Sequence, residues 1–244
     1  MIIHLGHIHE LARYPVKSMA GVATTSAFLG WDGLQGDRRF AFRRLHDHSD
    51  FPWLTASKLP ELILYTPLGI DESADEPLPA EVRTPEGSVF PIASPELQNS
   101  VASKFGSAVE LMRLRHGIFD DACVSVINLA TITAIGRETG LNPDTRRFRA
   151  NVVLATESNE SFLEDGWVGK RLIIGSEETG PVISLTKRDL RCMMINLDPD
   201  TAVLDPRVMK TAVRLNDNNA GVYGTVVRTG HISVGDPVSL IVEA

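Results

Sequence analysis

The chain has 244 residues, of which 43% are hydrophobic and 23% charged, and its formal net charge at pH 7 is −7. These proportions are ordinary for a soluble globular protein, and the length allows a full hydrophobic core. The acidic balance argues against general nucleic-acid binding, which usually shows as a basic domain or stripe. There is neither a signal peptide pattern nor an apolar run near the ~20 residues of a membrane helix, so we expect a cytoplasmic protein outside the membrane.

Strands separated by Gly, Pro and Asp turn signals are predicted for the first part of the chain. In the first of these, His7 and His9 alternate with apolar or small neighbours, as on a solvated strand face rather than in a metal site. An acidic segment, residues 71–81, is expected to be a surface loop. The predicted strands cover residues 2–14, 22–29, 39–45 and 61–68, and a hairpin covers residues 81–92.

Two helices are predicted, one after the capping pair Ser94-Pro95 up to Gly106, the other after Asn128 up to Gly140. Strand character then returns in residues 150–155, 170–176, 181–185 and 191–197, and a final hairpin turns near Gly230. Many short strands with few helices predict a mainly β fold with peripheral helices. We expect a β-rich domain in residues 1–93 and a β-barrel domain in residues 94–244.

Two polar segments of the first domain are candidates for anion binding. Lys17 and Ser18 follow Pro15 at a strand end, where a turn can present an ammonium, a hydroxyl and backbone N–H groups together. The alternative is a solvated turn. Arg38 either forms a structural pair with Asp37 or points into a site as a forked anion donor.

Two segments of the second domain are also candidates. Strand alternation is expected to place Arg147 and Arg149 on one face, where they would hold an anion or pair with carboxylates. Cys192 lies beside Arg191, which would make its thiol easier to ionise, and a thiolate is a nucleophile and a soft metal ligand. A core role is the alternative for Cys192 and the expected one for Cys123. Two cysteines are too few for a disulfide framework.

Taken in order, these segments resemble the MOSC family, in particular the branch that includes the mitochondrial amidoxime-reducing components and their bacterial relatives. The similar motifs, which span nearly the whole chain, are YPVKSMAGV, DRRF, FRANVVL, EDGWVGKRLIIG, RCMMINLDPDT and GTVVRTGHISVGDPV. The resemblance implies an N-terminal β-rich domain packed on a MOSC β-barrel, with a molybdenum–molybdopterin cofactor between them and no pyridoxal phosphate.

The resemblance also implies roles for particular residues. Cys192 would be the catalytic thiolate ligand of molybdenum. The other residues expected to bind the cofactor are Lys17, Ser18 and Arg38, at its phosphate end, and Arg147, Arg149, Asn151 and Arg191. Asp198 and Asp200, in the Asp-Pro-Asp corner after Cys192, are expected to form a turn rather than to act as acids.

The expected function is an oxidoreductase that removes oxygen from N-hydroxylated small molecules at a Cys-ligated molybdenum. Electrons would come from a separate protein, ferredoxin-like or cytochrome b5-like with a reductase, because the chain has no cysteine cluster for an electron relay of its own. The alternative is a non-redox carrier of molybdenum cofactor or of persulfide sulfur on Cys192. A barrel with a decayed site is a third reading, against which the retained basic residues and Cys192 speak.

Overall fold

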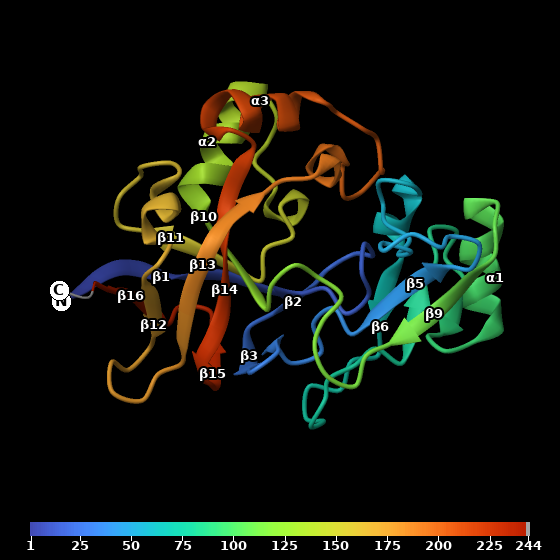
Figure 1. Cartoon of the computed structure of the whole chain (residues 1–244), viewed down its shortest axis with the longest axis horizontal. Helices are drawn as coiled ribbons and strands as arrows, with labels where there is room; N and C mark the ends of the chain where they lie inside the picture. The colour runs from blue at the N-terminus through green and yellow to red at the C-terminus, as the bar shows by residue number, and fades with distance from the viewer. Residues whose placement is uncertain (243–244) are drawn as a thin grey trace.

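A closed barrel of seven strands forms the larger half of residues 1–242, the part of the chain that the computed structural model describes (Figure 1). Around the barrel the order is β1, β11, β10, β14, β13, β12, β16 and back to β1. All neighbours are antiparallel except β10 and β11. The bounds are β1 Ile2–Arg13, β10 Val124–Asn128, β11 Val152–Thr156, β12 Arg171–Ile174, β13 Val182–Leu190, β14 Asn219–Arg228 and β16 Pro237–Ile241.

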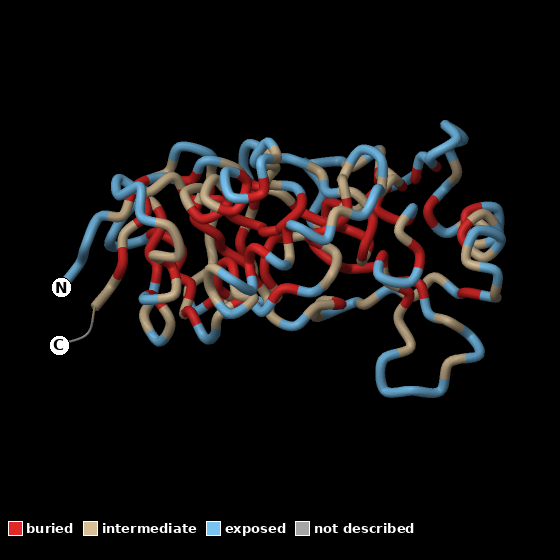
Figure 2. The backbone as a smooth tube through the Cα atoms, turned by 90° about the horizontal axis from the view of Figure 1, so that it is seen from above, coloured by how far each residue is buried: buried red, intermediate tan, exposed pale blue. Residues whose placement is uncertain are grey.

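The barrel interior is a packed core. Alternate residues of each strand point inward, as the period of two in a strand requires. Val124 and Val126 do so from β10, and Leu172 and Ile174 do so from β12. In Figure 2 the buried segments run along the centre of the molecule and the exposed ones lie outside them. The barrel is therefore a rigid support for the loops at its ends.

Strand β1 closes the barrel, and Gly6 permits it. The register shifts between His4 and Gly6 against β16 and between Ile8 and Glu10 against β11. At Gly6, whose φ is +147°, a Cβ atom would lie 2.0 Å from the carbonyl oxygen of Ala155. Bulges of this kind bend and twist a strand, so β1 can pair with partners on both sides.

The smaller half is built from short sheets and one helix. Its core includes Phe42, Leu62, Val82 and Leu97, and Val16 and Met19 from the segment after β1 join it. Lys17 and Ser18 therefore stand where the two halves meet. The strands outside the barrel are β2 Val22–Thr24, β3 Ser26–Gly30, β4 Gly33–Leu34, β5 Phe40–Arg44, β6 Thr66–Leu68, β7 Glu81–Arg83, β8 Val89–Pro91, β9 Val109–Arg113 and β15 Gly230–Ser233.

Three α-helices lie on the outside of the described chain, which is mainly β with peripheral helices as predicted. They are α1 Pro95–Phe105, α2 Leu129–Thr139 and α3 Arg207–Asn216, and the short 3₁₀ helices are η1 Pro60–Leu64, η2 Thr145–Arg147, η3 Leu163–Trp167 and η4 Met193–Asn196. Helices α2 and α3 pack side by side against the barrel wall (Figure 1). No helix among residues 1–242 has the length and apolarity needed to cross a membrane.

The two predicted helices are confirmed together with their caps. The Ser94 hydroxyl accepts the Leu97 N–H at 3.2 Å, and the Asn128 side chain accepts the Ala130 N–H at 3.2 Å. Gly106 ends α1 in a left-handed conformation that suits glycine.

Several sequence predictions are wrong. Residues 61–68 are a 3₁₀ helix and a three-residue strand, and residues 193–196 are a 3₁₀ helix rather than a strand. Residues 22–29 break into β2 and β3. The expected final hairpin does not form, because β15 pairs with β3 and β16 pairs with β1 and β12. Helix α3 was not expected.

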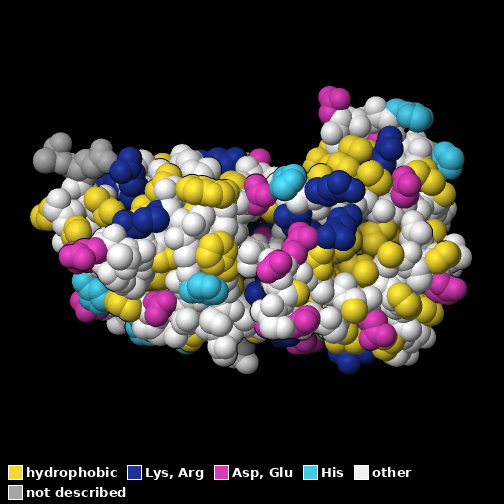
Figure 3. All heavy atoms as spheres, turned by 90° about the horizontal axis from the view of Figure 1, so that it is seen from below, with side chains coloured by type: hydrophobic (Ala, Val, Ile, Leu, Met, Phe, Trp, Pro, Cys, Tyr) yellow, Lys and Arg dark blue, Asp and Glu magenta, His cyan; other side chains and the backbone are white. Residues whose placement is uncertain are grey.

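The acidic segment after β6 is largely an exposed loop, as predicted, and basic side chains hold it. Arg13, only 1% exposed at the end of β1, donates to Glu72 at 2.7 and 2.8 Å. Arg39 and Arg113 both pair with Glu76, at 3.0 and 2.7 Å. Figure 3 shows basic and acidic side chains intermingled where the two halves meet. The loop therefore braces the segments that carry Lys17 and Arg38.

Candidate functional site

A cavity of about 270 Å³ lies at the junction of the two halves. Its walls come from segments far apart in the chain, between Lys17 and Tyr223. Seven of the eight residues that the sequence singled out line it: Lys17, Ser18, Arg38, Arg147, Arg149, Arg191 and Cys192. The eighth, Asn151, lies behind the wall, where its side-chain oxygen accepts from Arg38 Nη1 at 3.2 Å.

The backbone is strained at three positions of the cavity wall. Ser18, Arg38 and Arg149 have φ values of +67°, +46° and +52°. Non-glycine residues adopt this left-handed conformation uncommonly, and it persists only where surrounding contacts enforce it. Strain of this kind gathers at functional sites, so three such residues around one cavity support a binding role for it.

Arg38 both pairs with Asp37 and lines the cavity, the two alternatives that the sequence left open. It forms an ion pair with Asp37 and a second one with Asp120, and it lines the cavity. Its Nη2 also donates to the carbonyl oxygen of Arg149 at 3.0 Å. These contacts, with Asn151, hold the guanidinium in one orientation.

Arg149 is a cation without a carboxylate partner in the part of the chain that the structure describes. Its Nη1 donates to the carbonyl oxygen of Met19 at 2.7 Å, and its guanidinium lies 4.3 Å from the centre of the Tyr14 ring. Burial lowers the pKa of Arg149, and the neighbouring Arg38 adds to this. An anion in the cavity would relieve this uncompensated charge.

Arg147 and Arg149 line one cavity, although the expected strand alternation is wrong. Thr145–Arg147 is a 3₁₀ turn, Phe148 is in the right-handed helical region and Arg149 in the left-handed region. Phe148 is buried against the helical layer. The two arginines thus reach the cavity through a turn.

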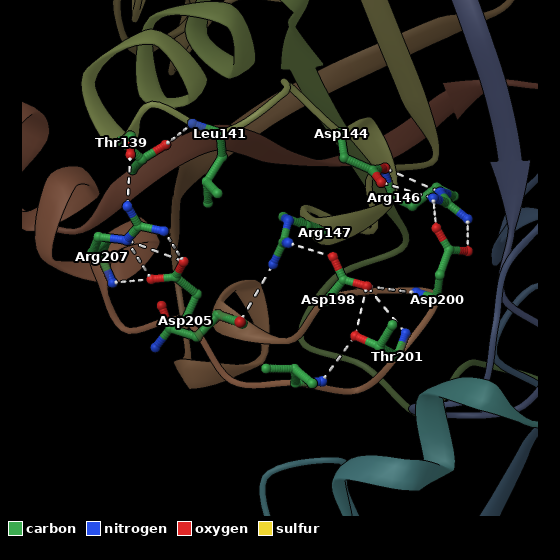
Figure 4. A network of polar contacts seen from close by, with 12 residues as sticks. Thr139, Leu141, Asp144, Arg146, Arg147, Asp198, Asp200, Thr201, Asp205 and Arg207 are labelled. Atoms are coloured by element: carbon green, nitrogen blue, oxygen red, sulfur yellow. Dashed lines mark hydrogen bonds and ion pairs between the residues drawn. The ribbon is translucent and has the colours of Figure 1, made fainter.

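Ion pairs tie this turn to the segment after Cys192 (Figure 4). Arg147 Nη2 pairs with Asp198 at 2.8 Å, and Arg146 pairs with Asp200 at 2.7 Å. The Asp198 carboxylate also accepts the N–H groups of Asp200 and Thr201, both at 3.1 Å. The expected turn at Asp198 and Asp200 is confirmed, and it fixes one wall of the cavity against another.

Arg191 is buried, and one of its nitrogens has no partner. Its Nη1 pairs with Asp189 at 2.9 Å and donates to the carbonyl oxygen of Phe148 at 2.7 Å, while Nε donates to that of Ala220 at 2.6 Å. Nη2 has no hydrogen bond within residues 1–242. A Cβ atom on Gly221 would come within 3.0 Å of Nη2, so glycine keeps this space open.

Cys192 is exposed at the cavity wall and directly precedes η4. The guanidinium of Arg191 is paired with Asp189. Lys17 is a cavity cation whose pKa responds to the charge of Cys192. Burial lowers the pKa of the Lys17 ammonium, and the negative charges of Asp120 and of Cys192 in its thiolate form oppose that effect. Cys123 packs against the barrel core, partly buried, as a structural residue would.

Sequence reasoning missed Asp120, Asp189 and Tyr223, which also line the cavity. Asp120 is one of two aspartates just before a buried strand, which is a weak signal. Asp189 precedes Arg191 by two residues, and a single aspartate near the end of a predicted strand gives no signal of its own. With two carboxyl groups and five cationic side chains, the cavity is locally basic in an acidic chain.

Two family models match the chain, one for the MOSC N-terminal beta barrel domain over residues 5–103 and one for the MOSC domain over residues 113–239. This chain belongs to the MOSC family. In this MOSC protein the cavity draws Lys17 and Arg38 from the first matched region and Arg149 and Cys192 from the second. The division expected between residues 93 and 94 stays a prediction.

Curated relatives of this MOSC protein include mitochondrial amidoxime reducing component 2 from Bos taurus, 28% identical over 137 residues, and from Homo sapiens, 34% identical over 104 residues. The matches cover 51% and 37% of this chain, and 38% and 29% of those relatives, so they span less than half of the relatives' length. The structure of the YuaD protein from Bacillus subtilis is similar in fold over 98% of this chain and 96% of its own, with a TM-score of 0.51 and 14% identity.

Proposed function

We propose that the cavity binds an anionic molybdenum–molybdopterin cofactor and that the protein is an oxidoreductase removing oxygen from N-hydroxylated compounds. The observation that supports this best is the meeting of five cationic side chains and one exposed thiol in a single cavity. A phosphorylated pterin would supply a negative charge for Arg149, which has no carboxylate partner in the described chain, because guanidiniums bind phosphate through forked hydrogen bonds.

The residues suit this cofactor by two tests. Arg149 has no carboxylate partner and Arg191 Nη2 has no hydrogen bond within the described chain, so both retain capacity for an anion. No group of three or more His, Cys, Asp or Glu side chains among residues 1–242 could hold a metal ion. A metal would therefore have to arrive with ligands of its own, as it does on the dithiolene of molybdopterin.

In this proposal Cys192 is the protein thiolate on the metal, since a thiolate suits a soft metal centre. Lys17, Ser18 and Arg38 bind the phosphate end. Further contacts come from Arg147, Arg149 and Arg191, while Asn151 orients Arg38. When bound, the cofactor would supply two-electron oxygen-atom chemistry, and the chain's own residues would bind and orient it.

The names of the curated relatives support the substrate class, because they reduce amidoximes, which carry an N–OH group. We infer that electrons come from a separate ferredoxin-like or cytochrome b5-like protein with its reductase. Cys192 is exposed and lines the cavity, so a small substrate in the cavity would meet it.

The first test is metal and pterin analysis of the protein made in a host that synthesises molybdenum cofactor. We expect near-equimolar molybdenum and turnover of an amidoxime with a chemical electron donor. Cys192→Ala should lose the metal or the turnover, whereas the matched control Cys123→Ala should keep both.

The exposed thiol also favours one second candidate, a persulfide or cofactor carrier. A carrier would release sulfane sulfur or exchange its cofactor and would show no turnover with any donor. Wild-type protein without molybdenum and pterin would overturn the oxidoreductase proposal and leave the carrier.

A further inference from the structure

The cavity holds two carboxyl groups in unlike surroundings, Asp120 and Asp189. Asp120 lies between cations: it pairs with Arg38 and is 3.9 Å from the Lys17 ammonium. Burial opposes its ionisation, but Arg38 and Lys17 outweigh that effect and lower the pKa of Asp120. Asp120 is therefore a fixed negative charge that keeps Lys17 and Arg38 in place.

Asp189 is 2% exposed, near the end of β13, and uses one oxygen for its contacts. Oδ2 forms an ion pair with Arg191 Nη1 at 2.9 Å and accepts a hydrogen bond from the Ser125 hydroxyl at 3.2 Å. Within residues 1–242 no hydrogen bond reaches Oδ1, and Asp189 lines the cavity. Oδ1 is thus the oxygen that a molecule in the cavity would meet.

The groups around Asp189 come from every neighbouring element. Arg191 follows β13, Ser125 is on β10 and Tyr223 is on β14, and the charges of Asp120 and Arg38 act across the cavity. Burial, helped by Asp120, raises the pKa of Asp189 to about 6 against the opposing effect of Arg191. Burial also raises the pKa of Tyr223, which keeps its proton throughout the neutral range.

Two acidic groups of one site whose surroundings drive their pKa values apart commonly divide the tasks of acid and counter-charge. Asp120 is held ionised and Asp189 holds its proton more firmly. The arginines of the cavity do not release protons at neutral pH.

We propose that Asp189 is the proton donor for the reaction in this cavity and that Ser125 is the residue that positions its carboxyl group. The inference rests on the proposed function. Reduction of an N–OH compound breaks the N–O bond and takes up two electrons and two protons, giving an N–H group and water. The external electron-transfer protein supplies the electrons, Asp189 supplies one proton, solvent supplies the other, and solvent then reprotonates the carboxylate.

The test compares Asp189→Asn with wild type, both loaded with cofactor and normalised per molybdenum. Wild-type turnover should fall as the pH rises through about 6, because the donor must be protonated. Asp189→Asn should lose at least about tenfold in turnover below that pH, since general acid catalysis contributes ~10²–10⁴-fold. In Asp189→Asn the turnover should also no longer decrease as the pH rises through about 6.

Two further measurements separate a proton donor from a structural residue. Ser125→Ala removes a hydrogen bond to the ionised carboxylate, so the fall in turnover should move to higher pH. Infrared titration, which needs no turnover, should show a protonated carboxyl band in wild type that is absent in Asp189→Asn. The matched control is Glu164→Gln, a second buried carboxyl that does not line the cavity. It should leave the turnover profile unchanged.

The proposal is overturned if Asp189→Asn keeps the wild-type profile while holding molybdenum, or if the infrared band does not titrate with Asp189. Absence of molybdenum and turnover from wild type would instead overturn the proposed function, and the donor role with it. These two failures are told apart by the metal content of wild type.

Discussion

At the scale of one residue, Arg149 shows how a residue of a binding site differs from one that only stabilises the hydrophobic core. Its backbone is left-handed and its partly buried charge is not neutralised by a carboxylate in the described chain. A residue chosen for stability alone would have neither feature, because a strained backbone and an unpaired buried cation both disfavour folding. We therefore expect Arg149 to matter for ligand binding more than for stability.

Arg149→Met tests this expectation. The variant keeps the length of the side chain and removes the charge, so its unfolding free energy in urea should stay within about 1 kcal/mol of wild type. Cofactor retention should fall at least about tenfold, which corresponds to ~1.4 kcal/mol of binding. Arg137→Met, an exposed position on α2, is the control and should retain cofactor. Loss of stability without loss of cofactor would contradict the expectation.

At the scale of elements, Glu164 joins η3 to the start of α2. It is fully buried, accepts from the Thr131 hydroxyl at 2.9 Å and lies 3.4 Å from the backbone nitrogen of Asn128. Burial raises the pKa of Glu164 to about 7, because no cation offsets the desolvation. The contact between the two elements is therefore strongest when Glu164 is protonated.

The raised pKa of Glu164 makes the free energy of unfolding decrease as the pH rises. A group with a raised pKa binds its proton more tightly in the folded state, so its contribution is complete below pH 4.5 and is lost as the pH rises to about 7. The shift corresponds to at most about 3 kcal/mol. Glu164→Gln should remove this part of the pH dependence. Urea unfolding at several pH values measures it, and an unchanged slope in the variant would count against the assignment.

At the scale of the whole molecule, the first strand completes a barrel built mainly from the second half of the chain. Residues 2–7 of β1 pair with β16, and residues 6–11 pair with β11. Without β1, both neighbours would present unpaired edges, which favour aggregation. The two halves are therefore one folding unit as far as the barrel is concerned.

Truncation and circular permutation test this directly. The exposed segment around His116 is a suitable place to open the chain. A chain that begins at Gly117 should aggregate or unfold without cooperativity. A permutant that begins at Gly117, continues through a linker from Ala244 to Met1 and ends at His116 should fold, because it restores β1 beside β16. Circular dichroism and size-exclusion chromatography compare the two, and a cooperative monomer from the truncated chain would refute the prediction.

Much of the local structure could be predicted because its signals are local. Ser94 and Asn128 cap their helices with their own side chains, and Asp198 forms its turn within three residues. Helix α3 also has a local signal, because Asp205 precedes Pro206 and its Oδ1 accepts the Arg207 N–H at 3.1 Å, although Pro206 itself offers no side-chain cap. By pattern alone, the apolar run around Ile195 is equally compatible with a strand and a helix. In the fold this run forms a 3₁₀ helix, and Ile195 packs into the core beneath α2 and α3.

The sequence by itself determined the alternation that fills the barrel, the helix caps, the family and most residues of the candidate site. Only the tertiary structure decided that β15 pairs with β3 rather than with β14 and that β1 closes the barrel. It also placed Asn151 where its side-chain oxygen accepts a hydrogen bond from Arg38. It also decided which carboxyl group of the cavity has a lowered pKa, Asp120, and which has a raised one, Asp189. The physical reason is that propensity and capping act over a few residues, whereas burial, ion pairing and strand closure depend on groups that are distant in the chain and adjacent only after folding.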